Sequence, residues 1–214
     1  MQDHLAISTD QETISELQPK PFQLRIARYV SNILAPAPIS LPFIVLVALY
    51  HAKNKPLALL YALITLFFLS VGPLIYVLIG VRLGKISDVD VSRRNERAGP
   101  FLFGITSVLA GWLALILLQA PANLQTVLII TVVSGILMML TTLWWKISIH
   151  ASSMGGAATV LTALYGGVML PTFLLLILVS WSRVVLRRHT VLQVVAGSLV
   201  SVALSLLILK IRGV

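Results

Sequence analysis

Long apolar runs dominate this sequence and limit what the chain can fold into. A helix that crosses the hydrocarbon core of a bilayer needs roughly 20 mainly apolar residues, and runs near that length recur from residue 33 to residue 209. Hydrophobic residues make up 58% of the 214 residues and charged residues only 11%, so the chain has too little polar surface for a water-soluble globule. We therefore expect an all-α integral membrane protein.

Seven candidate helices follow from the apolar runs and from the Pro and Gly breaks between them. We expect them at about residues 33–50, 57–79, 101–118 and 124–145, as two short helices within 152–180, and at 190–209. The pair at 101–118 and 124–145 predicts a helical hairpin, Gly72-Pro73 predicts a kink, and Gly166-Gly167 with Pro171 divides the long run. The expected fold is a polytopic transmembrane helix bundle of six to seven spans.

The first thirty residues differ from the apolar remainder. They carry four acidic residues followed by three basic ones, namely Asp3, Asp10, Glu12, Glu16, Lys20, Arg25 and Arg28. This order is not that of a cleaved signal peptide, in which a basic start precedes an apolar stretch. We expect a polar N-terminal leader at residues 1–30 and an integral-membrane domain at residues 31–214.

Basic residues gather on one predicted face of the membrane. Alternation of seven spans brings three polar segments, 82–97, 146–150 and 182–189, to the face that also holds the N-terminus. Twelve of the 16 Lys and Arg residues fall there, together with His150 and His189. The positive-inside rule accounts for such an excess and predicts that this face is cytoplasmic. It does not account for serine and histidine beside arginine, which together supply phosphate donors and proton transfer. We therefore expect the active site, a phosphate site, at this face.

The three segments resemble the motifs of the type 2 phosphatidic acid phosphatase and vanadium haloperoxidase superfamily. Those motifs have the forms Lys-x6-Arg-Pro, Pro-Ser-Gly-His and Ser-Arg-x5-His-x3-Asp. The third is filled at the expected spacing by Ser182-Arg183-x5-His189, and Gly197 follows in an apolar helix, as is typical of the family. The resemblance runs from about Leu57 to the C-terminal end and implies a membrane lipid phosphatase.

The resemblance also implies a role for each matching residue. His189 would be the nucleophile that forms a phosphohistidine, and Arg183 would bind phosphate. Ser148 and His150 match the second motif, which makes them a phosphate donor and the general acid for the leaving group. Arg97 matches the arginine of the first motif and would also contact phosphate.

Two of the motifs depart from the family pattern in their basic and small residues. Asp90 stands where the first motif has lysine, so a cation would come from Arg93, Arg94 or Lys85, and we expect Arg94 because it lies one helical turn from Arg97. In the second motif, isoleucines at 147 and 149 replace proline and glycine, which crowds the approach to phosphate. Lys146 is expected to act as an additional cation.

The third departure concerns the partner of the nucleophile. Gln193 stands where the third motif has aspartate, four residues after His189 and on the same helix face. Its carbonyl oxygen can accept the imidazole N–H and fix the tautomer, but it brings no negative charge to stabilise imidazolium. We therefore expect Gln193 to serve as a weaker catalytic partner and the activity to be reduced.

The sequence leads to one expected function and leaves two alternatives open. We expect a phosphatase that hydrolyses a lipid phosphomonoester or diphosphate, phosphatidic acid-like or polyprenyl, through a phosphohistidine. The alternatives are a non-catalytic or degenerate protein of the same fold that binds anionic lipid headgroups and, least favoured, a vanadate-dependent halide oxidase. The expected partners are a membrane lipid phosphate and the bilayer.

Several other classes of function are excluded from the sequence. The chain has no cysteine and no ligand cluster spaced for zinc, and the resemblance implies metal independence, so we expect no cofactor and no metal. Nucleic acid is excluded because the basic residues border spans instead of forming a soluble surface with aromatic residues. The lipid tail, the number of phosphates and the oligomeric state stay open.

Overall fold

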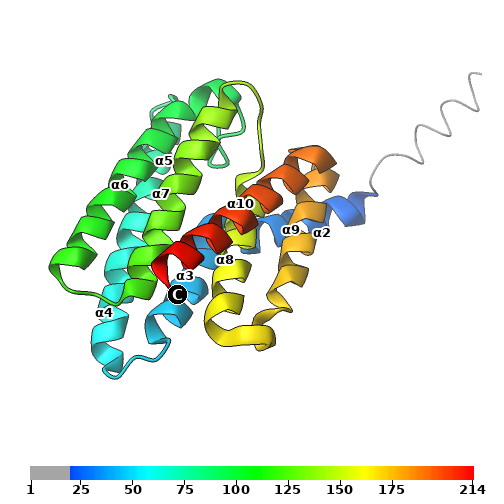
Figure 1. Ribbon diagram of the computed structural model, residues 1–214. Coiled ribbons are helices and arrows are strands. Elements are labelled where there is room, and N and C mark those ends of the chain that lie inside the picture. Colours follow the sequence, from blue (N-terminus) through cyan, green and yellow to red (C-terminus); the bar gives the residue numbers. More distant parts are fainter. Residues whose placement is uncertain (1–19) are drawn as a thin grey trace, which may run out of the picture.

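The computed structural model describes residues 20–214, and every regular element in that range is a helix (Figure 1). The long helices are α2 (Pro21–Ile33), α3 (Pro36–Leu49), α4 (Lys55–Leu66), α5 (Gly72–Arg82), α6 (Ala98–Leu117), α7 (Ala122–Thr142), α8 (Ile149–Tyr165), α9 (Thr172–Val185) and α10 (Val191–Arg212). Three short elements are the π-helix η1 (Phe67–Val71) and the 3₁₀ helices η2 (Arg94–Glu96) and η3 (Gly166–Met169). The all-α prediction is confirmed. Residues 1–19 of the predicted leader lie outside the described residues.

Four helical segments are long and apolar enough to cross a membrane. They cover residues 55–82, 94–117, 122–142 and 191–212, and a fifth results if α2 and α3, which are bent by 45° relative to each other, count as one span. The structure thus supports an integral membrane protein but does not confirm six to seven spans. The reason is length, because α3 and α9 have 14 residues each and reach about 21 Å, short of a hydrocarbon core of about 30 Å.

The predicted kink at Gly72-Pro73 takes the form of a π-helical turn. The amide of Gly72 bonds to the carbonyl of Phe67, five residues earlier. Pro73 has no N–H to offer to the carbonyl of Phe68, and Ser107 Oγ of α6 donates to that oxygen at 2.7 Å instead. The segment from α4 to α5 therefore passes the proline as one continuous helix.

Two helical hairpins form where the sequence predicted breaks. The helices α6 and α7 lie side by side and form the predicted hairpin (Figure 1). The run after residue 150 divides into α8 and α9, as expected from Gly166-Gly167 and Pro171. Gly166 ends α8 with φ +76°, a conformation that glycine adopts without a steric penalty.

The helices α8 and α10 cross at very close range. A Cβ atom added to Gly197 would lie 2.8 Å from the carbonyl oxygen of Ser148, and one added to Gly155 would lie 2.6 Å from Ser201 Oγ. Small residues at such positions let two helices approach closely. The amide of Ser148 also donates to the carbonyl of Gln193 at 3.2 Å. This contact fixes the start of α8 against the first turn of α10.

Candidate active site

The three polar segments lie together, as the alternation of spans predicted. Each leads into the N-terminus of a long helix, α6, α8 or α10, where the helix dipole favours an anion. Ser92 connects the segments, because its carbonyl accepts from Lys146 Nζ at 2.9 Å and its Oγ accepts from Arg188 Nη1 at 2.8 Å. Their convergence is therefore held by specific hydrogen bonds.

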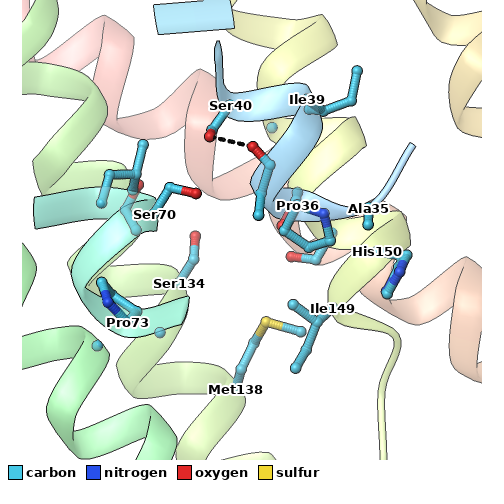
Figure 2. Close-up of a pocket in the computed structure, with 18 of the residues that line it drawn as sticks. Ala35, Pro36, Ile39, Ser40, Ser70, Pro73, Ser134, Met138, Ile149 and His150 are labelled. Atoms are coloured by element: carbon cyan, nitrogen blue, oxygen red, sulfur yellow. Dashed lines mark hydrogen bonds between the residues drawn. The ribbon is translucent and has the colours of Figure 1, made fainter. Parts of the chain in front are cut away.

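The segments form one wall of a cavity of about 420 Å³. The titratable side chains that line it are Asp90, Arg97, His150, Arg183 and His189. The remaining wall comes mainly from α3, α5, α6, α7 and α8 and is largely apolar, with a few hydroxyl groups. Figure 2 shows Met138, Ile149 and Pro73 around this space, together with the hydroxyl groups of Ser70 and Ser134. The cavity thus joins a charged wall to an apolar one.

Arg183 lies near the end of α9 with 4% of its surface exposed. Its Nη1 donates to Ser31 Oγ of α2 at 2.7 Å and to Asp90 Oδ2 at 3.0 Å. Its Nε is buried and has no hydrogen-bond partner within residues 20–214. A buried N–H without a partner is unfavourable unless a ligand or water fills the position. Arg183 is therefore anchored through one nitrogen and has another available for an anion.

Arg97 is arranged in the same way from another segment. It caps the N-terminus of α6 with 3% of its surface exposed. Its Nε donates to the carbonyl of Val91 at 3.0 Å, while its buried Nη1 has no partner in the described part of the chain. Two fixed guanidinium groups thus line one cavity, each with a free N–H, which is the donor type that suits a phosphate.

His189 lies between α9 and α10, 6% exposed, with Nδ1 3.2 Å from Gln193 Oε1. The same oxygen accepts the amide of Thr190 at 3.1 Å, which identifies it as the amide oxygen and not the nitrogen. An oxygen that only accepts requires the proton on Nδ1, so the lone pair lies on Nε2. The expected contact between Gln193 and His189 is present.

The charge state of His189 follows from its surroundings. Burial, and then the positive charges of Lys146, Arg183 and Arg97, lower the pKa of His189 to about 3, although the hydrogen bond to Gln193 acts in the opposite direction. The imidazole is therefore neutral near pH 7, as a nitrogen nucleophile must be.

His150 is the second residue of α8 and lines the same cavity, 8% exposed (Figure 2). Burial and the charge of Arg183 lower its pKa to about 4, while Asp90 acts in the opposite direction. Ser148, two residues earlier, is fully buried and caps α8 by accepting the amide of Ala151 at 3.4 Å. The second predicted motif therefore brings its histidine to the cavity and uses its serine in the helix cap.

Residues 141–213 match the family model of the PAP2 superfamily. This match is consistent with a member of the type 2 phosphatidic acid phosphatase superfamily and confirms the predicted resemblance. It indicates a phosphatase-type protein, and it includes His150, Arg183, His189 and Gln193 while leaving Asp90 and Arg97 outside. No curated protein and no solved structure matches the chain.

Three predicted phosphate ligands do not line the cavity, namely Arg94, Lys146 and Ser148. Arg94 is exposed and donates to the carbonyl of Trp144 at 3.1 Å. Arg94 belongs to the 3₁₀ turn η2, and α6 begins only at residue 98. Arg94 and Arg97 are therefore not one α-helical turn apart, contrary to our expectation. Lys146 donates to the carbonyl of Ser92, and the hydroxyl of Ser148 caps α8. Lys146 still adds positive charge near His189.

The structure adds Asp90 to the residues around His150 and His189. The sequence marked it only as an acidic residue at a position where the family has lysine. Its carboxylate lines the cavity and pairs with Arg183, 93 residues later in the chain. Ser31 and Ser92, which hold Arg183 and connect the segments, carried no recognisable signal in the sequence.

Proposed function

We propose that this protein is an integral-membrane phosphatase that hydrolyses a lipid phosphate ester through a phosphohistidine on His189. The observation that carries the proposal is a single cavity in which Arg97, Arg183, His150 and His189 meet a largely apolar wall. The phosphate would be bound by the two guanidinium groups. The lipid tail would lie among the helices.

The first chemical step would transfer the phosphoryl group to the imidazole. The lone pair on His189 Nε2 attacks phosphorus, and the bond from phosphorus to the ester oxygen breaks. His150 gives a proton to the departing oxygen, so the lipid leaves as an alcohol. In the second step water attacks phosphorus, the bond from phosphorus to His189 Nε2 breaks, His150 takes the proton of that water, and inorganic phosphate is released.

The acid role of His150 depends on the bound substrate. Burial and the charge of Arg183 hold the pKa of His150 near 4, so the ring is neutral near pH 7. A bound phosphate carries about 1.5 to 2 negative charges at pH 7 and offsets the two guanidinium groups. Its arrival therefore raises the pKa of His150 and favours the protonated form that the first step needs.

Gln193 would hold the nucleophile without adding charge. Its oxygen keeps the proton of His189 on Nδ1, which leaves Nε2 free to attack. Because an amide stabilises imidazolium less than a carboxylate does, turnover would be slower than in a site with aspartate. Ile149, which lines the cavity, would narrow the approach of the phosphate. We further propose that the site faces the cytoplasm, because the positive-inside rule favours that side.

The test is phosphate release by the purified full-length protein in detergent with EDTA present. Phosphatidic acid and a short polyprenyl diphosphate serve as substrates for the wild type, His189→Ala, Arg183→Ala and His51→Ala. His51 is exposed at the turn after α3 and stacks on Tyr50, so its variant is the matched control. We expect activity in the wild type and in His51→Ala and a loss of about 10³-fold or more in the other two variants.

Two results would contradict the proposal. Turnover that persists in His189→Ala excludes a phosphohistidine at that residue. A folded wild type that releases no phosphate from either substrate supports the alternative of a protein that only binds anionic lipid headgroups. Acid-labile incorporation of ³²P into the wild type but not into His189→Ala would identify the intermediate directly.

A further inference from the structure

Asp90 brings a negative charge into a cavity that otherwise suits an anion. It lies in the segment between α5 and η2, and Asp90 Oδ2 is 3.0 Å from Arg183 Nη1. The side chain of Asp90 is 35% exposed, whereas that of Arg183 is 5% exposed. Among the described residues that line the cavity it is the one acidic side chain. A carboxylate in this position must affect any phosphate that binds beside it.

The carboxylate is ionised under ordinary conditions. Burial alone would raise the pKa of Asp90, but the positive charge of Arg183 and the hydrogen bond that Arg183 donates lower it below its usual value. Asp90 is therefore a fixed negative charge. It does not give way to an incoming phosphate by taking up a proton.

The donors that remain free are sufficient for one phosphoryl group. Arg183 uses Nη1 for Asp90 and Ser31 and keeps a buried Nε free, while Arg97 uses Nε for Val91 and keeps a buried Nη1 free. Within the described residues, no other Lys or Arg side chain lines the cavity. A second phosphoryl group would add negative charge to a cavity that already holds the carboxylate of Asp90. Like charges at short range repel, and the more so where water is excluded.

We propose that Asp90 is a specificity-determining residue that makes the site select lipids with a single phosphate group over lipid diphosphates. This inference rests on the proposed phosphatase function and specifies its substrate class. Asp90 would act by repelling the additional charge of a diphosphate while it holds Arg183 in place for one phosphate.

The experiment compares two substrates that differ only in the number of phosphates, farnesyl monophosphate and farnesyl diphosphate. Initial rates of the full-length protein are measured in detergent. The products are separated, so that the first and second cleavages of the diphosphate are distinguished. The variants are Asp90→Asn, which removes the charge and keeps the shape, and Asp90→Ala. The control is Asp88→Asn, which removes the same charge from the same segment at a residue outside the cavity.

We expect the wild type to favour the monophosphate by about tenfold or more in kcat/KM. Asp90→Asn should reduce that preference by about tenfold, mainly by lowering the KM for the diphosphate, and Asp88→Asn should leave it unchanged. If Asp90 only positions Arg183, both substrates lose activity by the same factor and the ratio stays constant. That result, or a wild type that favours the diphosphate, overturns the inference.

The design separates this inference from the proposed function. A wild type that cleaves neither substrate refutes the function, whereas cleavage with an unchanged ratio refutes the role of Asp90 alone. If both Asp90 variants lack turnover, the inference is tested by measuring how far orthophosphate and pyrophosphate each raise the temperature of thermal unfolding. Orthophosphate should protect the wild type more than pyrophosphate does, and the Asp90→Asn variant should reverse that order. The same order in both proteins contradicts the proposal.

Discussion

The charged wall of the cavity is held by hydrogen bonds between segments that lie far apart in sequence, whereas its apolar wall consists of side chains on packed helices. Ser31 and Asp90 hold Arg183, while Ser92 holds Lys146 and Arg188. The opposite wall depends on the volume left between α3, α5, α6, α7 and α8. Reaction rate should therefore respond to changes at the charged wall, and chain-length preference to changes at the apolar wall.

Removal of a guanidinium group should have the largest effect. Arg97→Ala deletes a buried, anchored donor and is expected to lower kcat/KM by about 10²- to 10³-fold, equally for short and long lipid tails. The matched control is Arg94→Ala, three residues earlier, which removes an exposed arginine outside the cavity. Steady-state kinetics on two chain lengths measure both variants. Equal losses in the two variants would show that charge near the membrane face, and not a specific contact, matters.

A larger side chain in the apolar wall should change the preference between short-chain and long-chain substrates, by a smaller factor. Gly104 lines the cavity, and a Cβ added to it would meet nothing within 4 Å. Gly104→Leu fills that space and is expected to raise KM for a long-chain substrate by about tenfold, which corresponds to about 1.4 kcal/mol, with little change for a short one. Leu109→Phe, which enlarges an exposed residue of the same helix, is the control. An equal change for both chain lengths would refute a tail site here.

The smallest expected effect is a change in the titration of the nucleophile. The pKa of His189 lies near 3, so hydrogen–deuterium exchange at its ring carbon, followed by mass spectrometry, should show no midpoint between pH 5 and 8. Gln193→Asp places a negative charge beside the ring, which favours imidazolium and raises the pKa of His189. Gln125→Glu adds the same charge at the start of α7 and should not move it. A midpoint near 6.5 in the wild type would contradict the buried, neutral state.

The sequence predicted the central residues of the site because their positions follow from span alternation and local spacing. Arg97, His150, Arg183 and His189 each lie at or beside the end of a helix, so counting helices was enough to bring them to one face. Gln193 could be placed beside His189 because four residues make about one helical turn. These relations depend only on distances along the chain.

The parts that the sequence did not predict depend on contacts between distant residues or on irregular backbone. Arg94 was expected at the phosphate because an α-helix was assumed there, and the 3₁₀ turn of η2 directs it to Trp144 instead. The pair between Asp90 and Arg183 joins residues 93 positions apart, which no local pattern reveals. The number of spans stays a prediction, because apolar runs were counted without knowing how much of each becomes helix.

The position of the apolar wall has a consequence for how the protein would meet its substrate. Its lining residues belong largely to α5, α6 and α7, which form parts of the segments long enough to cross a membrane. A lipid held there would keep its tail within the protein while its phosphate is cleaved. Encounters would then occur by lateral diffusion in two dimensions, so the rate would follow the mole fraction of substrate in the membrane. Dilution with inert lipid at constant bulk concentration would slow the reaction.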